Sequence, residues 1–272
     1  HMTVSIEELE RISIDAGRLI EKLKAEGRGF SRKDDGSPVT EADRYAEELI
    51  LERLAKAYPD IPVVAEELAS EGNTPKVAVP RFFLVDPLDG TKEFIRGSGD
   101  YTVNIALIEN RAPVAGVVAA PARNVLYSGA GMAAARVDID VGGRRSDRRT
   151  IRVLSRSDSW VAVVSASHMT PATDALLKQL PIARSVSIGS SLKFCLVAEG
   201  EADVYPRLGR TMQWDTAAGD AVLRAAGGST LTLDGAPLLY GPRGSDGLDY
   251  ANPHFVCFGG VPARLAELSG AA

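Results

Sequence analysis

Apolar residues recur every three or four positions over two stretches near the start of the chain. Residues 5–25 and 40–58 each place these residues on one side of a helical wheel and charged residues on the other, and Pro59 follows the second stretch. An apolar face opposite a charged face is typical of a helix that packs on a core from one side. The pattern therefore predicts two amphipathic helices over these ranges.

Short apolar runs bounded by turn residues come next. They cover residues 61–65, 81–85, 101–109, 114–120 and 125–128. Their lengths and boundaries predict strands, and the brief breaks between the last three predict an antiparallel meander. The segment 141–150, which reads VGGRRSDRRT, has no apolar period, so we interpret it as a loop that connects two halves of the chain.

Predicted strands and helices alternate in the remainder of the chain. The predicted strands are 160–164, 184–188, 203–205, 229–233 and 254–258, and the predicted helices are 171–179, 191–199 and 215–226. Strands in both halves indicate a mixed α and β protein with more than one sheet. We predict an N-terminal α+β part over residues 1–140 and a C-terminal α/β part over residues 150–272.

Charge and cysteine content narrow the classes of partner. A net charge of −5 over 272 residues provides no general attraction to nucleic acid. Its two cysteines, Cys195 and Cys257, stand far apart in apolar surroundings, which is typical of a reducing compartment. No apolar run is long enough to predict a membrane span. We expect a cytoplasmic protein, with peripheral membrane association and oligomeric state left open.

The segment VDPLDGTKEF contains the first candidate chemistry. Asp86 and Asp89 follow an apolar run, and Pro87 is expected to end the strand and turn the chain so that both carboxylates face one point. Gly90 and Thr91 can then present backbone N–H groups to an anion. The two carboxylates would repel that anion unless a divalent cation lay between them. Mg²⁺ prefers carboxylate and phosphate oxygens as ligands. The alternative is an ordinary turn with a helix cap.

Three other segments place acids at the ends of predicted elements. Glu66 and Glu67 follow the β-branched run VVA, Asp215 begins an alanine-rich helix in QWDTAAG, and Thr40 and Asp43 form the T-x-x-D pattern of a capping box. Each has a plain structural explanation, as solvated acids, a helix N-cap and a capping box respectively. Only their combination favours a common site.

In chain order, the segments VTEAD, AEE, DPLDGT and WDTAAG resemble the motifs of the inositol monophosphatase superfamily of Mg²⁺-dependent, lithium-sensitive phosphatases. The resemblance extends from about residue 39 to residue 258. It implies a layered αβαβα sandwich of the inositol monophosphatase and fructose-1,6-bisphosphatase type, with the site in the cleft between the two halves. Ala65 stands where the superfamily usually has glycine.

The resemblance also implies roles for individual residues. The metal ligands would be Glu66, Asp86, the carbonyl of Leu88, Asp89 and Asp215. They would hold two or three Mg²⁺ ions, and a metal-activated water would be the nucleophile. Asp43 and Thr91 would orient that water, so that the implied catalytic residues are Asp43, Thr91 and Glu66.

Other segments resemble the branch of the superfamily that hydrolyses 3′-phosphoadenosine 5′-phosphate to AMP and phosphate. They are TKEF after DPLDG, SASH at 165–168, GSSLKF at 189–194 and YPRLG at 205–209. The substrate contacts implied are Gly90, Thr91, Ser165, His168, Ser190, Lys193, Arg207 and Asp215. Ala166 stands where this branch usually has arginine. We therefore predict a phosphoric monoester hydrolase acting on adenosine 3′,5′-bisphosphate, a small-molecule by-product of sulfate assimilation.

Other functions remain as alternatives at this point. The enzyme could instead act as an inositol monophosphatase or a fructose-1,6-bisphosphatase, or it could be a regulator that has lost turnover. His168 could be a surface or capping histidine, and Lys193 a solvated charge. The segment GAGMAA at 129–134 fits the G-x-G-x-x-A pattern of a dinucleotide site, but no acidic residue closes a following strand at the required distance.

Overall fold

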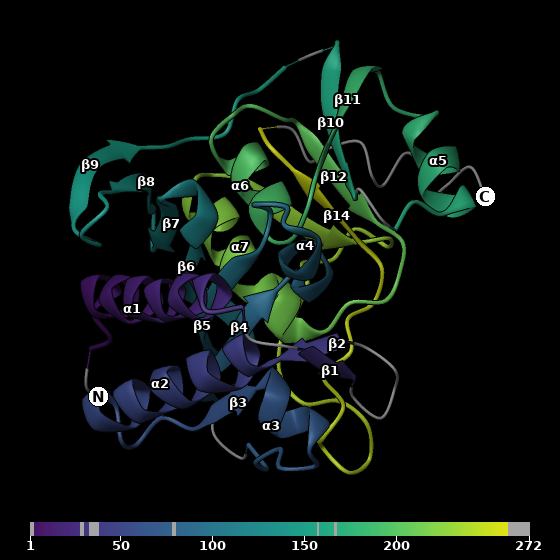
Figure 1. The fold of residues 1–272 in the computed structure, drawn as a ribbon. Coiled ribbons are helices and arrows are strands. Elements are labelled where there is room, and N and C mark those ends of the chain that lie inside the picture. The colour runs from purple at the N-terminus through teal and green to yellow at the C-terminus, as the bar shows by residue number, and fades with distance from the viewer. Residues whose placement is uncertain are drawn as a thin grey trace.

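The computed structural model of the chain describes residues 3–27, 30–32, 38–77, 80–156, 158–165 and 168–260. Two large sheets form the frame of this part of the molecule, with helices between and outside them (Figure 1). The short strands β1 (Phe30–Arg32) and β2 (Pro38–Thr40) pair as a separate two-stranded ribbon.

The first large sheet has seven strands in the order β3-β4-β5-β6-β7-β8-β9. The strands are β3 (Val63–Ala65), β4 (Arg81–Asp89), β5 (Thr102–Glu109), β6 (Ala112–Ala120), β7 (Val125–Ala130), β8 (Ala133–Ile139) and β9 (Arg145–Thr150). β3 runs parallel to β4, and every later neighbour is antiparallel. The predicted meander is thus confirmed and continues through β8 and β9.

The second large sheet has five strands in the order β11-β10-β12-β14-β13. The strands are β10 (Trp160–Ser165), β11 (Ile182–Ile188), β12 (Val204–Arg207), β13 (Ser229–Thr232) and β14 (Phe255–Phe258). The first three in this spatial order are parallel, and β14 and β13 join antiparallel. All five strands predicted for this part of the chain are confirmed.

Helices separate and cover the two sheets. They are α1 (Ile6–Ala25), α2 (Glu41–Ala57), α3 (Glu66–Ser70), α4 (Thr91–Arg96), α5 (Pro171–Leu177), α6 (Leu192–Ala198) and α7 (Gln213–Ala225), with a 3₁₀ turn η1 at Pro121–Arg123. α1 and α2 cover one face of the seven-stranded sheet, α6 and α7 fill the space between the sheets, and α5 packs outside the second sheet. The predicted αβαβα layering is confirmed.

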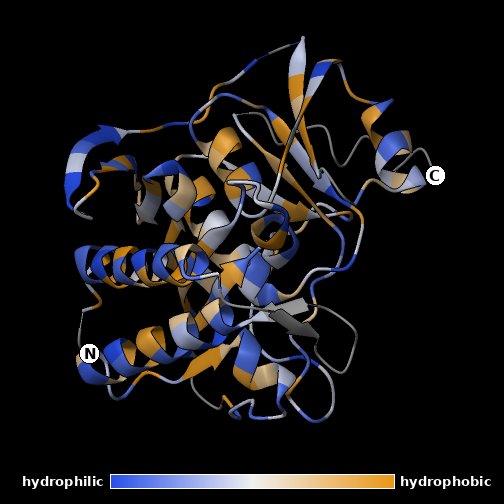
Figure 2. Cartoon of the chain, viewed as in Figure 1, coloured by the Kyte–Doolittle hydropathy of each residue, from blue (hydrophilic) through white to orange (hydrophobic). Residues whose placement is uncertain are grey.

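Local sequence signals account for where the first two helices begin. The Ser5 side chain accepts a hydrogen bond from the backbone N–H of Glu8 at 3.3 Å, which caps α1. Thr40 and Asp43 form a reciprocal capping box at the start of α2. Figure 2 shows apolar and polar bands alternating along both helices, as an amphipathic helix requires.

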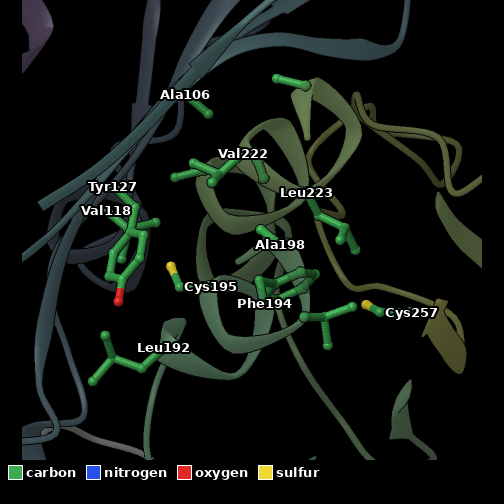
Figure 3. Close-up of a cluster of buried hydrophobic side chains, with 14 of the residues drawn as sticks. Ala106, Val118, Tyr127, Leu192, Phe194, Cys195, Ala198, Val222, Leu223 and Cys257 are labelled. Carbon is green, nitrogen blue, oxygen red and sulfur yellow. The ribbon is translucent and has the colours of Figure 1, made fainter. Parts of the chain in front are cut away.

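The layer between the sheets is packed with apolar side chains. Phe194 and Cys195 of α6 and Val222 of α7 are buried there between residues of both sheets (Figure 3). A Cβ built on Gly116 of β6 would lie 2.8 Å from the carbonyl oxygen of Ala218, so glycine is needed for α7 to approach the sheet so closely. This contact brings the start of α7 next to β4.

The prediction of a connecting loop over residues 141–150 is partly wrong. Residues 145–150 form β9, a fully exposed edge strand of the seven-stranded sheet. The buried carboxylate of Glu10 binds Arg145 and Arg148 at 2.7 and 3.0 Å. The strand therefore has no apolar period because side-chain ion pairs and a backbone ladder hold it, without a buried face of its own.

The GAGMAA segment forms the turn between β7 and β8, without the helix that a dinucleotide site needs. A Cβ on Gly129 would lie 2.7 Å from the Cα of Val222, and Gly131 adopts a positive φ of 59° in the hairpin. Both glycines thus have structural explanations. Within the described residues, no helix has the length and apolar character needed to cross a bilayer.

Candidate metal and phosphate site

Three acids from different elements converge at one end of the seven-stranded sheet. Glu66 is the first residue of α3, Asp86 lies in β4 and Asp215 lies in the first turn of α7. One carboxylate oxygen from each lies within 4.8 Å of the others. The convergence depends on the parallel pairing of β3 with β4 and on the approach of α7 to the sheet.

A bulge in β4 brings Asp89 to the same region. Asp86 pairs with Asn104 and Asp89 pairs with Thr102, so the register shifts between them. The predicted end of the strand at Pro87 is therefore wrong, because the ladder resumes after the proline. The backbone N–H of Leu88 donates to Asp86 Oδ1 at 3.0 Å and stabilises the bulge.

The acids are costly to ionise together in this position. Burial raises the pKa of Asp86 well above its ordinary value, and repulsion from Glu66 and Asp89 raises it further. Burial also raises the pKa of Asp89 and, together with the charge of Asp89, raises the pKa of Asp215 to about 8. A cation among these carboxylates would reverse both effects. The ligand atoms that these acids offer to a metal ion are all carboxylate oxygens, which Mg²⁺ prefers.

Asp43 and Thr91 form a hydrogen-bonded pair beside the acids. The Thr91 hydroxyl donates to Asp43 Oδ1 at 3.0 Å and approaches the Leu88 carbonyl oxygen at 3.3 Å. The other Asp43 oxygen accepts the backbone N–H of Thr40 at 2.7 Å. Burial raises the pKa of Asp43. The capping box is therefore present, and the same aspartate also reaches the candidate site.

Glu47 supports the site and was missed in the sequence. It lies on α2, is 3% exposed, and accepts the backbone N–H groups of Glu67 and Leu68 at 2.8 and 2.9 Å. These donors open α3, whose first residue is Glu66. The available signal was an acid four residues after Asp43, on the buried side of the predicted helix.

A cavity of about 230 Å³ opens above the acids. It is lined by the predicted residues Glu66, Asp89, Gly90, Thr91, Ser165, His168, Ser190, Lys193, Arg207 and Asp215. Asp43, Asp86 and Leu88 are not among its lining residues and reach it through the contacts described above. Ala166, the departure noted in the sequence, lies outside the described residues.

Lys193 and Arg207, with Ser165 and His168 beside them, form a cationic wall of the same cavity. Lys193 is 5% exposed, and burial lowers its pKa to about 8. Arg207 Nε is buried without a hydrogen-bond partner in the described part of the chain. Ser165 Oγ lies 3.2 Å from His168 Nδ1, and burial together with Arg207 lowers the pKa of His168. The cationic wall can therefore offer hydrogen-bond donors, such as Arg207 Nε, to a bound anion.

The turn before α6 connects this wall to the acids. Ser190 has a positive φ of 61°, and its hydroxyl donates to Asp89 Oδ2 at 2.6 Å. The preceding residue, Gly189, donates its backbone N–H to Asp100 Oδ2 at 3.0 Å. Asp100 also pairs with Arg123. Asp100 was not predicted as a site residue, because nothing in its local sequence marks a contact with residues so distant in the chain.

Comparisons with known proteins all point to the same family. The model of the inositol monophosphatase family matches residues 5–257. The chain is 44% identical to 3′(2′),5′-bisphosphate nucleotidase CysQ of Salmonella typhimurium, covering 92% of this chain and 98% of that one. The corresponding protein of Escherichia coli K12 is 47% identical over 82% of this chain and 86% of its own.

A solved structure gives the same result for the fold. The crystal structure of CysQ from Bacteroides thetaiotaomicron, described as a bacterial member of the inositol monophosphatase family, superimposes with a TM-score of 0.75 at 34% identity. The match covers 93% of this chain and 96% of that one.

Proposed function

Because the chain belongs to the inositol monophosphatase family, we propose that it is a metal-dependent 3′(2′),5′-bisphosphate nucleotidase. It removes the 3′-phosphate of 3′-phosphoadenosine 5′-phosphate and releases AMP and phosphate. The observation that carries this proposal is the pairing, across one cavity, of a buried acidic cluster with a separate cationic wall. The names of the relatives support the choice of a bisphosphate nucleotide.

The acidic cluster has the composition of a magnesium site. Glu66, Asp86, Asp89 and Asp215, with the carbonyl of Leu88, would hold two or three Mg²⁺ ions. When bound, these ions supply the Lewis acidity that makes water nucleophilic near neutral pH and offset the charge of the phosphate oxygens. The raised pKa values of Asp86, Asp89 and Asp215 support this assignment, since burial of like charges needs such compensation.

Asp43 and Thr91 would position the attacking water and receive its proton. Because the Thr91 hydroxyl donates to Asp43 Oδ1, its oxygen remains able to accept a hydrogen bond from water. Asp43 has a raised pKa, which makes it a better proton acceptor than an ordinary aspartate. Gly90 and Thr91 would hold the phosphate under attack with backbone N–H groups at the start of α4.

The cationic wall would hold the part of the substrate that does not react. Lys193 and Arg207 provide the charge and donors that a 5′-phosphate needs. The predicted contact of Ser190 would require its hydroxyl to leave Asp89 Oδ2, to which it donates in this structure. Ser165 and His168 would lie beside the ribose or base. A monophosphate ester such as inositol 1-phosphate has no second phosphate for this wall, so it would not gain the contacts that Lys193 and Arg207 offer.

Three further parts of the proposal concern the setting of the reaction. We place the protein in the cytoplasm, which agrees with its two buried free thiols. We expect inhibition by Li⁺, because the proposed site is of the metal-dependent type to which the sequence is similar. We also expect the enzyme to clear the nucleotide by-product of sulfate assimilation.

Phosphate release from three substrates tests the proposal. Adenosine 3′,5′-bisphosphate, inositol 1-phosphate and fructose 1,6-bisphosphate are compared at equal concentration with Mg²⁺, with EDTA and with added Li⁺. We expect the highest kcat/KM for the nucleotide and no turnover with EDTA. A preference for either sugar phosphate would exclude the nucleotide assignment, and activity that survives EDTA would exclude the metal mechanism.

A further inference from the structure

One acid in the wall of the cavity is not explained by the proposed metal site. Glu93 lies in the first turn of α4, is half-buried and lines the cavity. A Cβ built on Gly90 would lie 3.3 Å from Glu93 Oε2, and one built on Gly189 would lie 3.2 Å from Glu93 Cγ. The carboxylate therefore folds back beside the start of α4 and faces the turn that precedes α6.

The other acids at this site meet one another or accept hydrogen bonds, whereas Glu93 has cationic neighbours but no described hydrogen-bond donor. Glu66, Asp86 and Asp215 meet one another, and Asp43 and Asp100 accept hydrogen bonds. For Glu93, the described part of the chain provides no side-chain hydrogen bond and no ion pair. Lys193 and His168 line the same cavity and are close enough for the charge of Glu93 to raise the pKa of each. Neither donates a hydrogen bond to Glu93 within the described residues, so this acceptor is available to a hydroxyl group of the substrate.

We propose that Glu93 is a specificity-determining residue whose carboxylate accepts a hydrogen bond from the ribose hydroxyl next to the phosphate being removed. This inference rests on the proposed function, and it names the substrate group that the site reads. Glu93 lines the same cavity as Thr91, and its carboxylate lies beside Gly90, so it is near the proposed position of the reacting phosphate. In adenosine 3′,5′-bisphosphate the donor nearest to that phosphate is the 2′-hydroxyl, whereas the adenine amino group lies at the far side of the base.

The charge of Glu93 also restricts what can occupy the neighbouring position. A second phosphate on the adjacent carbon would place a dianion against the carboxylate and would be rejected. A hydrogen in place of the hydroxyl would remove the hydrogen bond that the substrate donates to Glu93. From the strength of hydrogen bonds to charged groups, we expect the 2′-deoxy substrate to lose roughly ten- to a hundred-fold in kcat/KM.

A cycle of two substrates and three proteins tests the inference. The wild-type enzyme, Glu93→Gln and Glu93→Ala are assayed with adenosine 3′,5′-bisphosphate and with its 2′-deoxy analogue at saturating Mg²⁺. We expect the preference of the wild type for the ribonucleotide to disappear in Glu93→Ala. It should persist in part in Glu93→Gln, because an amide oxygen still accepts a neutral hydrogen bond. Glu201→Ala, an exposed acid outside the cavity, should keep the wild-type ratio.

The outcomes separate this inference from the proposed function. If the wild type hydrolyses both nucleotides equally well, Glu93 does not read the hydroxyl, although the nucleotidase function stands. Equal losses on both substrates in Glu93→Ala would also overturn the inference. If the wild type releases no phosphate from adenosine 3′,5′-bisphosphate, the proposed function and this inference both fail. If Glu93→Ala does not fold, the kcat/KM ratio of the ribonucleotide to its 2′-deoxy analogue is compared between Glu93→Gln and the wild type. A ratio unchanged in Glu93→Gln would then overturn the inference, and a reduced ratio would support it.

Discussion

Glu47 holds the helix that presents Glu66, so replacing Glu47 should weaken magnesium binding while leaving the nucleotide wall intact. Its two carboxylate oxygens accept backbone N–H groups at 2.8 and 2.9 Å, and the side chain is 3% exposed. Hydrogen bonds to a buried charge contribute about 1.5–3 kcal/mol each. Leu68 is only partly buried, so water can replace part of the second bond. We therefore expect Glu47→Ala to cost about 2–4 kcal/mol.

Part of this cost should appear as lost metal affinity. Without its cap, the start of α3 can move, and Glu66 then has to be fixed in place when the metal binds. Each 1.4 kcal/mol corresponds to a factor of about ten in an equilibrium constant. We expect the Mg²⁺ concentration for half-maximal activity to rise at least about tenfold. Glu47→Gln should behave similarly, because its amide NH₂ group would face one of the two N–H donors.

The assay is phosphate release titrated with Mg²⁺, accompanied by thermal melting of each variant. Glu48→Gln is the matched control, because the neighbouring residue is exposed and should change neither quantity. The KM for the nucleotide at saturating Mg²⁺ should stay within about twofold of the wild type, a result that general loosening of the fold would not produce. A folded Glu47 variant with an unchanged Mg²⁺ titration would refute the reasoning.

Three other predictions follow from the charges at the site. Asp89→Asn should lower turnover by orders of magnitude without destabilising the metal-free protein, because it removes one like charge from the acidic cluster; extensive unfolding in a melting experiment would instead indicate a structural role. In EDTA the free energy of unfolding should fall as pH rises from about 4 to about 8, since the folded state retains protons on Asp86 and Asp215 that the unfolded state releases. Mg²⁺ should remove this slope, and melting profiles that are flat in EDTA would contradict the assignment. Lys193→Met removes a buried cation that lines the cavity, so it should raise the KM for adenosine 3′,5′-bisphosphate by roughly ten- to a hundred-fold with a smaller change in kcat. Steady-state kinetics would measure both constants, and an unchanged KM would show that Lys193 does not bind the substrate.

The elements that the sequence predicted well are those in which periodicity and burial coincide. α1 and α2 begin at Ser5 and Thr40 because their caps and apolar faces are local properties. Apolar runs and turn residues likewise predicted all the strands of both large sheets except β8 and β9. β9 was missed because an exposed edge strand held through Glu10 has no apolar face to detect.

For the candidate site, the sequence by itself determined which acids are available and in what order they occur. It also indicated that Asp86 and Asp89 needed a compensating charge, because their close spacing follows from the local sequence alone. Local spacing cannot show which distant residues meet. The tertiary structure decided that Glu66 and Asp215 join Asp86, that Glu47 caps α3 and that Glu93 faces the cavity, because each of these contacts depends on how the helices and sheets pack together.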